Sequence, residues 1–340
     1  MKTFNISQTL LNTIVRMLPI HAIILAMMVL GPPSASSAIQ ADHVILIILD
    51  GVGNDAIEAT SMPHLQQLAQ EGASTQTAQS LSPPLPVPAM ASLLTGVSIE
   101  KHRVTKEWET YDFSRSFLRA PTFFDYLDLA GGRDTALFLM DERFYQLSRP
   151  EIYVDSQMCG TAKPQCNPIT LVGHIQDYLK KVTSEGGYGF RIFTIPALLV
   201  AHLPEPAHIA SKRGFGSKPY RQSLQAVDTA VSKLINTYRE YGVLDTTMVF
   251  VIGLTGGTLD STQAKSPSGA PANSRSTVPW IAWGANIKPR HHVTQPVSIM
   301  DTGATVMEAL GLETYTEWDS HAIKEIFQTI PERRTTEKLF

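Results

Sequence analysis

One aspartate stands where a buried strand is expected to end. Asp50 follows the apolar run 44–49 and precedes Gly-Val-Gly. A carboxylate at the end of a central strand costs free energy unless it is paired or binds a metal ion. Asp50 could therefore bind a cation, or it could cap the next helix or accept hydrogen bonds from loop N–H groups. We favour capping or loop hydrogen bonds over a cation, because the sequence shows no partner ligand beside it.

Three further side chains with metal-binding chemistry lie close together in the sequence. His202, Glu205 and His208 follow one another within a few residues. A metal site built from them is one interpretation, and a solvated loop stiffened by two prolines is the other. We favour the solvated loop, because spacing alone is weak support for a metal site.

Hydroxyl side chains offer another possible chemistry. Ser82, Thr255 and Ser268 could act as nucleophiles only with a general base within hydrogen-bond reach. No histidine motif points to any of the three, so the sequence does not favour a new nucleophile.

Hydrophobic periodicity predicts strands that alternate with helices. Buried strands are predicted at 44–49, 136–140, 191–195, 248–252 and 278–283, and helices at 62–70, 122–129, 170–182, 220–238 and 301–310. This alternation indicates an α/β fold, a three-layer α/β/α sandwich with a mostly parallel central sheet. In such sheets the functional residues lie on loops at the carboxyl ends of the strands.

Length and composition indicate one globular domain. The chain has 340 residues, of which 43% are hydrophobic, and its formal net charge is -3. We predict a single domain over 39–340, with a loop or small cap region at about 101–166. The charge and the lack of a basic stretch exclude nucleic acid as an expected partner.

The N-terminus has the pattern of an export signal. Lys2 and Arg16 precede the apolar run 18–30, and small residues follow up to Ala38. We predict a signal peptide over 1–38 and a periplasmic or secreted protein. The alternative is an uncleaved membrane anchor, but the run is short for a segment that needs ~20 apolar residues.

The chain has two cysteines, Cys159 and Cys166, on either side of a short loop that contains Gly and Pro. In an exported protein this spacing predicts a local disulfide. Two free thiols are the alternative, which the oxidising setting disfavours.

An ordered series of motifs resembles a known family. The series resembles the type I phosphodiesterase/nucleotide pyrophosphatase branch of the alkaline phosphatase superfamily, from about His43 to about Phe327. It consists of Asp50-Gly, Met62-Pro-His-Leu, Pro88-Ala-Met-Ala-Ser-Leu-Leu-Thr-Gly96, Lys101-His-Arg, His202-Leu-Pro-Glu-Pro206, Gly214-Phe-Gly-Ser, Val278-Pro-Trp-Ile-Ala-Trp-Gly284 and Pro296-Val-Ser-Ile-Met-Asp-Thr-Gly303. The resemblance implies two divalent metal ions, usually zinc, that activate a Thr or Ser nucleophile and are held by six Asp or His ligands.

Carried over residue by residue, the resemblance implies a degenerate site. Asp50 matches the first metal ligand, but the nucleophile position holds Pro86, which has no hydroxyl. The positions of the other five metal ligands hold Ala207, Ser211, Leu254, Thr255 and Ser268. A catalytic zinc site ordinarily needs three protein ligands of Asp, His or Cys type. We therefore interpret the proline-rich stretch 82–88 as a stiffened loop that fills a vacated active site, rather than as a polyproline ligand for another protein.

Two functions follow from these observations. The favoured one is an exported pseudoenzyme with a binding or scaffolding role, without a metal cofactor. The partner of this pseudoenzyme is not identified; a protein and a small anionic ligand are the options. The protein contacts a membrane only if its N-terminal segment stays uncleaved. The alternative is a metal-dependent hydrolase of phosphate or sulfate esters with a rewired site.

Export generates the first testable prediction. We expect the mature protein to begin near Ile39, because the small residues before it form a cleavage site. Mass spectrometry of the protein from its native host measures this directly. A full-length mass that includes Met1 would show that no cleavage takes place.

Overall fold

The computed structural model describes residues 41–59, 62–112, 114, 118–147, 155–158, 166–184, 195–260 and 276–328. Its strands are β1 (His43–Asp50), β2 (Ala73–Gln79), β3 (Thr135–Leu139), β4 (Asp155–Met158), β5 (Leu198–Leu203), β6 (Thr247–Thr255), β7 (Thr277–Gly284) and β8 (His291–His292). Its α-helices are α2 (Asn54–Glu58), α3 (Pro63–Glu71), α4 (Pro86–Thr95), α5 (Ile99–His102), α6 (Phe123–Leu129), α7 (Pro168–Thr183), α8 (Glu205–Arg213), α9 (Lys218–Glu240) and α11 (Asp301–Ala309). Short 3-10 helices are η1 (Lys106–Glu109), η3 (Glu142–Leu147), η5 (Leu244–Thr246) and η7 (Lys324–Ile326).

The described strands form one sheet in the order β4-β3-β5-β1-β6-β7-β2-β8. From β4 to β6 every neighbouring pair is parallel, and β7 is antiparallel to both β6 and β2. The mostly parallel sheet predicted from the sequence is therefore confirmed.

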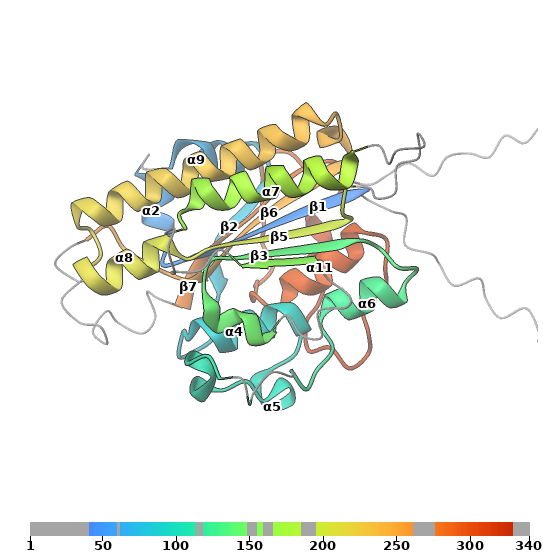
Figure 1. Ribbon diagram of the computed structural model, residues 1–340, viewed down its shortest axis with the longest axis horizontal. Helices are drawn as coiled ribbons and strands as arrows, with labels where there is room; N and C mark the ends of the chain where they lie inside the picture. Colours follow the sequence, from blue (N-terminus) through green and yellow to red (C-terminus); the bar gives the residue numbers. More distant parts are fainter. Residues whose placement is uncertain are drawn as a thin grey trace, which may run out of the picture. The chain divides into compact units, whose positions relative to one another are not determined.

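Helices cover both faces of this sheet. Alternate residues of β1 enter two separate cores, because successive side chains of a strand point to opposite faces. Val44, Leu46 and Ile48 pack in the core that holds residues of α4, α6 and α11. Ile45, Ile47 and Leu49 pack in the core that holds residues of α3, α7 and α9. Figure 1 shows α7 and α9 on one side of the sheet and α4, α6 and α11 on the other, which confirms the α/β/α sandwich.

The parallel register brings the ends of several strands to one edge. Asp50 pairs with Thr255 across β1 and β6, and Leu49 pairs with Leu203 across β1 and β5. β5 leads into α8, and β3 leads into Asp141 and η3. Side chains at these four strand ends therefore lie close together, as expected of a parallel sheet.

Some expected elements are placed differently. Pro86 does not lie in a loop: it opens helix α4, where proline suits the first turn because its missing N–H has no intrahelical role there. The prolines of 82–88 thus form the approach to a helix and its first turn. Of the strand expected at 191–195, residues 191–194 lie outside the described ranges, and β5 forms at Leu198–Leu203.

The stretch 101–166, expected as a loop or cap region, belongs in part to the sandwich itself. It contributes β3 and β4 to the central sheet, and α6 to the helical layer on one face. The predicted signal peptide at 1–38 and Cys159 lie outside the described residues, so export and the disulfide stay predictions. No helix in the described part of the chain has the length and apolar character needed to cross a membrane.

Helix α3 is fixed to α9 by one buried carboxylate. Asp228, on α9, accepts hydrogen bonds from the backbone N–H of His64 at 3.2 Å and of Leu65 at 2.9 Å. The ring Nδ1 of His64 lies 2.7 Å from the same carboxylate. The start of α3 has no side-chain cap from its own N-cap residue Met62, so Asp228 supplies the cap from another helix.

This cap generates a stability prediction. Asp228→Ala should lower the free energy of unfolding by about 1–3 kcal/mol, because it leaves the buried N–H of Leu65 and the partly buried N–H of His64 without an acceptor. Denaturant unfolding monitored by circular dichroism measures the loss. Asp177→Ala is the matched control, because Asp177 is an exposed aspartate on the neighbouring helix α7, and it should cost less than about 0.5 kcal/mol. Equal losses in the two variants would contradict the capping role.

Candidate functional site

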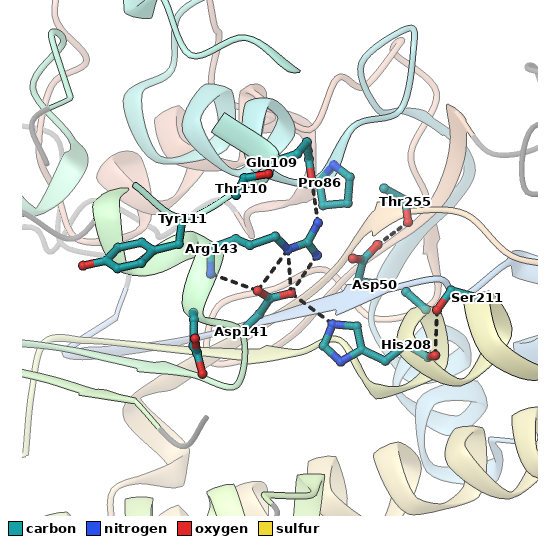
Figure 2. A pocket seen from close by; sticks show the side chains of 12 residues that line it. Asp50, Pro86, Glu109, Thr110, Tyr111, Asp141, Arg143, His208, Ser211 and Thr255 are labelled. Atoms are coloured by element: carbon teal, nitrogen blue, oxygen red, sulfur yellow. Dashed lines mark hydrogen bonds and ion pairs between the residues drawn. The ribbon is translucent and has the colours of Figure 1, made fainter. Parts of the chain in front are cut away.

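A cavity of about 700 Å³ opens at the carboxyl edge of the parallel strands. Its lining comes from the ends of β1 and β6, from α4 and α8, and from η1 and η3 with the residues beside them (Figure 2). The lining residues are Asp50, Pro86, Glu109, Thr110, Tyr111, Asp141, Glu142, Arg143, Ala207, His208, Ser211 and Thr255. Such a volume accommodates a small molecule.

Most positions singled out by the resemblance meet in this cavity. Asp50, Pro86, Ala207, Ser211 and Thr255 all line it, although they come from four separate elements. Ala207 and Ser211 lie on helix α8 and not on a loop.

One of the singled-out positions does not line the cavity: Leu254 is fully buried in the core on the α4 side of the sheet. Another, Ser268, lies outside the described residues.

Asp50 is fully buried, and one of its carboxylate oxygens has no partner. The hydroxyl of Thr255 donates a hydrogen bond to Oδ1, whereas Oδ2 has no hydrogen-bond partner in the described part of the chain. Burial raises the pKa of Asp50, although the Thr255 hydroxyl and the charges of Arg143 and His208 act in the opposite direction. The expected structural role of Asp50, capping the next helix or accepting hydrogen bonds from loop N–H groups, is not seen in the described residues, where the carboxylate accepts only from the Thr255 hydroxyl.

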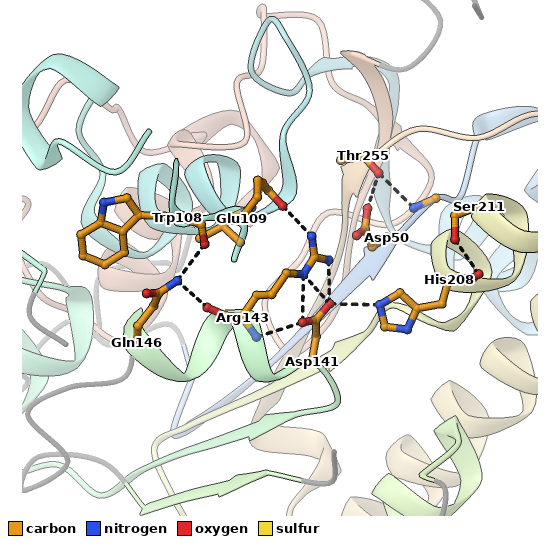
Figure 3. A network of polar contacts seen from close by, with 11 residues as sticks. Asp50, Trp108, Glu109, Asp141, Arg143, Gln146, His208, Ser211 and Thr255 are labelled. Atoms are coloured by element: carbon orange, nitrogen blue, oxygen red, sulfur yellow. Dashed lines mark hydrogen bonds and ion pairs between the residues drawn. The ribbon is translucent and has the colours of Figure 1, made fainter. Parts of the chain in front are cut away.

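An arginine lies at the centre of the cavity's polar network. Arg143 Nε donates to the two oxygens of Asp141 at 3.0 and 3.1 Å, and Nη2 donates to Oδ2 at 2.6 Å. Nη1 donates to Glu109 Oε2 at 2.5 Å, so the guanidinium bridges two carboxylates (Figure 3). On its other side, Asp141 Oδ2 lies 3.0 Å from Nε2 of His208. This bidentate geometry makes an Arg–carboxylate pair strong and directional.

The two carboxylates respond differently to the same arginine. Burial acts to raise the pKa of Asp141, but hydrogen bonds from His208 and Arg143 and the charge of Arg143 outweigh it and hold the pKa well below its usual range. Burial raises the pKa of Glu109, and one hydrogen bond from Val87 N–H and one contact with Arg143 do not offset it. The difference follows from the partners of each carboxylate, since Asp141 has a hydrogen bond from His208 and three contacts with Arg143, whereas Glu109 has one contact with Arg143.

Glu109 also fixes the wall that carries Pro86. Its Oε1 accepts a hydrogen bond from Val87 N–H at 2.9 Å, in the first turn of α4. An acidic side chain is favourable at a helix N-terminus. Gln146 Nε2 donates to Trp108 O at 2.8 Å and to Arg143 O at 3.0 Å, which joins η1 to η3.

The three residues considered for a relocated metal site do not converge. His202 is in strand β5, fully buried and packed edge-to-face on Phe144 at 4.5 Å between ring centroids. Burial lowers the pKa of His202 to about 3. Glu205 and His208 both lie on α8, but only His208 lines the cavity. Among the described residues, no group of three or more His, Cys, Asp or Glu side chains is arranged to hold a metal ion.

The candidate hydroxyl nucleophiles are also separated. Ser82 is exposed and does not line the cavity. Thr255 lines it, and its hydroxyl donates to the Asp50 carboxylate, so it alone of the two described candidates has a possible base within reach. A buried pair outside the cavity, Ser92 and His102, is structural: His102 Nδ1 accepts from Val104 N–H, which leaves Nε2 as the donor to Ser92.

Sequence reasoning missed Asp141, Arg143 and Glu109. A signal for Asp141 was present, because it directly follows the run 136–140 that predicts a buried strand. The same rule that selected Asp50 selects Asp141, since both carboxylates stand at the carboxyl end of a parallel strand. Glu109 has no such signal, because it lies on the short helix η1 far from any strand end.

The residues present do not fit the two metal ions that the resemblance implies. The positions of the implied ligands carry Ala207, Ser211, Leu254 and Thr255, and none of these is an Asp, His or Cys ligand. Two other carboxylates of the cavity, those of Asp141 and Glu109, are occupied by an internal cation, the guanidinium of Arg143. No chemical step through a metal ion is derived for this site.

Comparison with known proteins agrees with the architecture. The type I phosphodiesterase/nucleotide pyrophosphatase family matches residues 44–258, and the sulfatase family matches residues 217–312. A search of curated proteins found no significant match.

Solved structures of sulfatases have the same fold. A 2-O GAG sulfatase has a TM-score of 0.64 and 13% identity, with 84% of this chain and 74% of that chain covered. A Bacteroides thetaiotaomicron protein, described under the metabolism of multiple glycosaminoglycans, has a TM-score of 0.63 and 17% identity, with 86% and 78% covered. A protein in complex with its substrate D-glucosamine-2-N,6-O-disulfate has a TM-score of 0.60 and 12% identity, with 84% and 80% covered.

The sandwich and the matches define an alkaline-phosphatase-superfamily protein. Because its family match spans more than half of the chain, the protein belongs to the type I phosphodiesterase/nucleotide pyrophosphatase family. The family expected from the sequence is thus confirmed.

The network predicts that Arg143 is important for stability. The side chains of Arg143 and Asp141 are 29% and 6% exposed, so the Asp141 carboxylate loses its main partner when Arg143 is removed. Arg143→Met should lower the free energy of unfolding at pH 7 by about 2–3 kcal/mol, somewhat less than the loss of a partner in a fully buried pair. Denaturant unfolding measures this.

The same variant has a defined pH dependence. The folded-state pKa of Asp141 lies below its ordinary value of 3.8, so the contribution of the pair is present above that value and is lost as the pH falls below it. The deficit of Arg143→Met should therefore shrink below about pH 4. Lys101→Met is the control, because Lys101 forms an exposed pair with Asp319 and should cost less than about 1 kcal/mol. Equal losses in both variants at pH 7 would contradict the role of Arg143.

Proposed function

We propose that this chain is an exported pseudoenzyme, a binding protein built on a hydrolase fold. The proposal is supported by one observation above all: Arg143 is ion-paired with Asp141 and Glu109 inside the cavity where the resemblance implies metal ions. The chain provides its own counter-charge for the clustered carboxylates, and does so with a group that cannot perform Lewis-acid chemistry.

Electrostatics disfavours a divalent metal ion beside the arginine. Two like unit charges 4 Å apart repel by about 4 kcal/mol at an effective dielectric constant of 20, and the repulsion doubles for a divalent ion. A metal ion bound to Asp141 would also have to displace a bidentate guanidinium and the ring of His208. Arg143 therefore opposes metal binding through both charge and ligand occupancy.

The nucleophile position supports the same conclusion. Pro86 has no hydroxyl, and it lies at the start of α4, where the proline ring favours the helix. The position is thus adapted to local structure and not to covalent catalysis.

The second candidate function is a hydrolase with a rewired site, in which Thr255 would be the nucleophile. Its hydroxyl donates to Asp50, a buried carboxylate with a raised pKa, which is the arrangement of a nucleophile with a base. Against this, Thr255 is 1% exposed, and its oxygen also accepts a hydrogen bond from Gly51 N–H at 3.2 Å. We therefore favour a structural role for the Thr255–Asp50 contact.

One of the similar solved structures holds D-glucosamine-2-N,6-O-disulfate as its substrate, but the charge of this cavity disfavours an anionic sugar. In the described part of the chain, four carboxylates line the cavity, those of Asp50, Glu109, Asp141 and Glu142, against one arginine and one histidine. The small anionic ligand considered from the sequence is accordingly disfavoured.

Activity and metal dependence test the proposal together. The assay measures hydrolysis of three substrates: an aryl phosphate, an aryl phosphodiester and an aryl sulfate. Each is assayed with zinc and with chelator, for the wild type and for Pro86→Thr. We expect background rates throughout, because restoring a hydroxyl at Pro86 does not restore the metal ligands. A zinc-dependent rate that Asp50→Ala abolishes would contradict the proposal. A metal-independent rate that Thr255→Val abolishes would instead establish the second candidate.

Melting temperature provides an independent reading. A specific ion at a hundredfold excess over its Kd would add about 2.7 kcal/mol of stability, which corresponds to a shift of roughly 5 °C or more. We expect zinc and chelator each to shift the melting temperature by less than about 1 °C.

A further inference from the structure

Among the described residues, the carboxylates that line the cavity outnumber its basic side chains. Asp141 and Glu109 are both paired with Arg143, whereas Asp50 receives only the hydroxyl of Thr255 on Oδ1. Its Oδ2 is fully buried and has no hydrogen-bond partner in the described residues. Figure 2 shows the Asp50 carboxylate beside the guanidinium and the start of α8, on the wall of the cavity. An unsatisfied buried oxygen costs free energy that a bound donor recovers.

We propose that the cavity binds a small organic cation with a primary ammonium group, and that Asp50 Oδ2 is its principal acceptor. The inference rests on the proposed binding function and specifies the chemical class of the ligand. A primary ammonium has three N–H donors and a positive charge. A primary ammonium can therefore donate a hydrogen bond to Asp50 Oδ2 and reduce the negative charge of the cavity at the same time.

The arginine does not make the cavity an anion site. Each of the three guanidinium nitrogens of Arg143 already donates to a carboxylate, of Asp141 or of Glu109. An anion that used the remaining N–H groups would lie close to the carboxylates of Asp141 and Glu109, which repel it. The remaining cationic candidate, His208, is engaged with Asp141.

The donor set also favours an ammonium over a metal ion. A structural or catalytic metal ion needs several side-chain ligands, and the described residues contain no such group. An ammonium needs one carboxylate and a few neutral acceptors, and the hydroxyl of Ser211 lies on the same cavity wall. The volume of about 700 Å³ admits an amine with a carbon chain or ring.

Calorimetric titration of the full protein with three probes tests the proposal. The probes are 1,4-diaminobutane, tetramethylammonium and sulfate. We expect binding of the diamine, binding at least about tenfold weaker for tetramethylammonium because it has no N–H donor, and no binding of sulfate. Asp50→Asn keeps the shape and removes the charge, and it should weaken diamine binding by about tenfold or more.

A second variant covers the case in which Asp50→Asn does not fold. Ser211 is exposed on helix α8 and lines the cavity, so Ser211→Lys places an ammonium at the site without disturbing the core. It should abolish diamine binding and leave the melting temperature within about 2 °C of the wild type, because lysine is a good helix former. Asp319→Asn removes a carboxylate outside the cavity and should leave diamine binding unchanged.

Each other outcome has a defined meaning. Diamine binding that survives both Asp50→Asn and Ser211→Lys overturns the site. Binding of sulfate in place of the diamine, or no binding of either, overturns the ligand class but leaves the inactive, metal-free protein of the proposed function intact. Zinc binding that depends on Asp50, or zinc-dependent hydrolysis, overturns the proposed function itself.

Discussion

The ion pair between Arg143 and Asp141 is the interaction on which the candidate site depends. A parallel sheet gathers the carboxyl ends of its strands at one edge, and in this chain that edge carries the carboxylates of Asp50 and Asp141. Buried carboxylates in one place repel each other, and a nearby positive charge stabilises their charged forms. Arg143 supplies it from η3, two residues after Asp141. The fold thus creates an electrostatic requirement, and the sequence meets it with a side chain.

The rest of the cavity is organised around this pair. Glu109 joins the guanidinium to the first turn of α4, and His208 joins Asp141 to α8. The walls formed by η1, η3, α4 and α8 are therefore held by polar contacts that all lead to Arg143 (Figure 3). Networks of this kind impose a defined geometry when every member is satisfied. Two buried oxygens near this network, Asp50 Oδ2 and Gln146 Oε1, have no hydrogen-bond partner in the described residues. Of these two residues only Asp50 lines the cavity, and for that reason it identifies the place where a ligand can bind.

Much of the fold could be predicted from the sequence, because its signals are local. The continuous apolar runs at 44–49 and 248–252 became β1 and β6, and the helical pattern at 220–238 lies within α9.

Other positions differ from the prediction. The prolines of 82–88 suggest a loop at Pro86, although the first turn of a helix also accepts proline. Leu254 was matched to the site, but neighbouring residues of a strand point to opposite faces, and Leu254 enters the core while Thr255 reaches the cavity.

The polar network could not be predicted in the same way. Glu109 meets Arg143 across 34 positions of the chain, and His208 meets Asp141 across 67. Only the strand order places η3 beside α8, and no local pattern of residues encodes these contacts. The strand order and register of the sheet therefore decide which candidate residues meet in one site, and a local sequence pattern does not contain them.

The most direct test of the account is a crystal structure of the protein grown with excess zinc and measured at the zinc absorption edge. The account predicts Arg143 paired with Asp141 and Glu109, and no anomalous peak in the cavity. An anomalous peak at about 2.0–2.2 Å from an oxygen of Asp50 or Asp141, with Arg143 displaced, would show that the site still binds metal and would contradict the account.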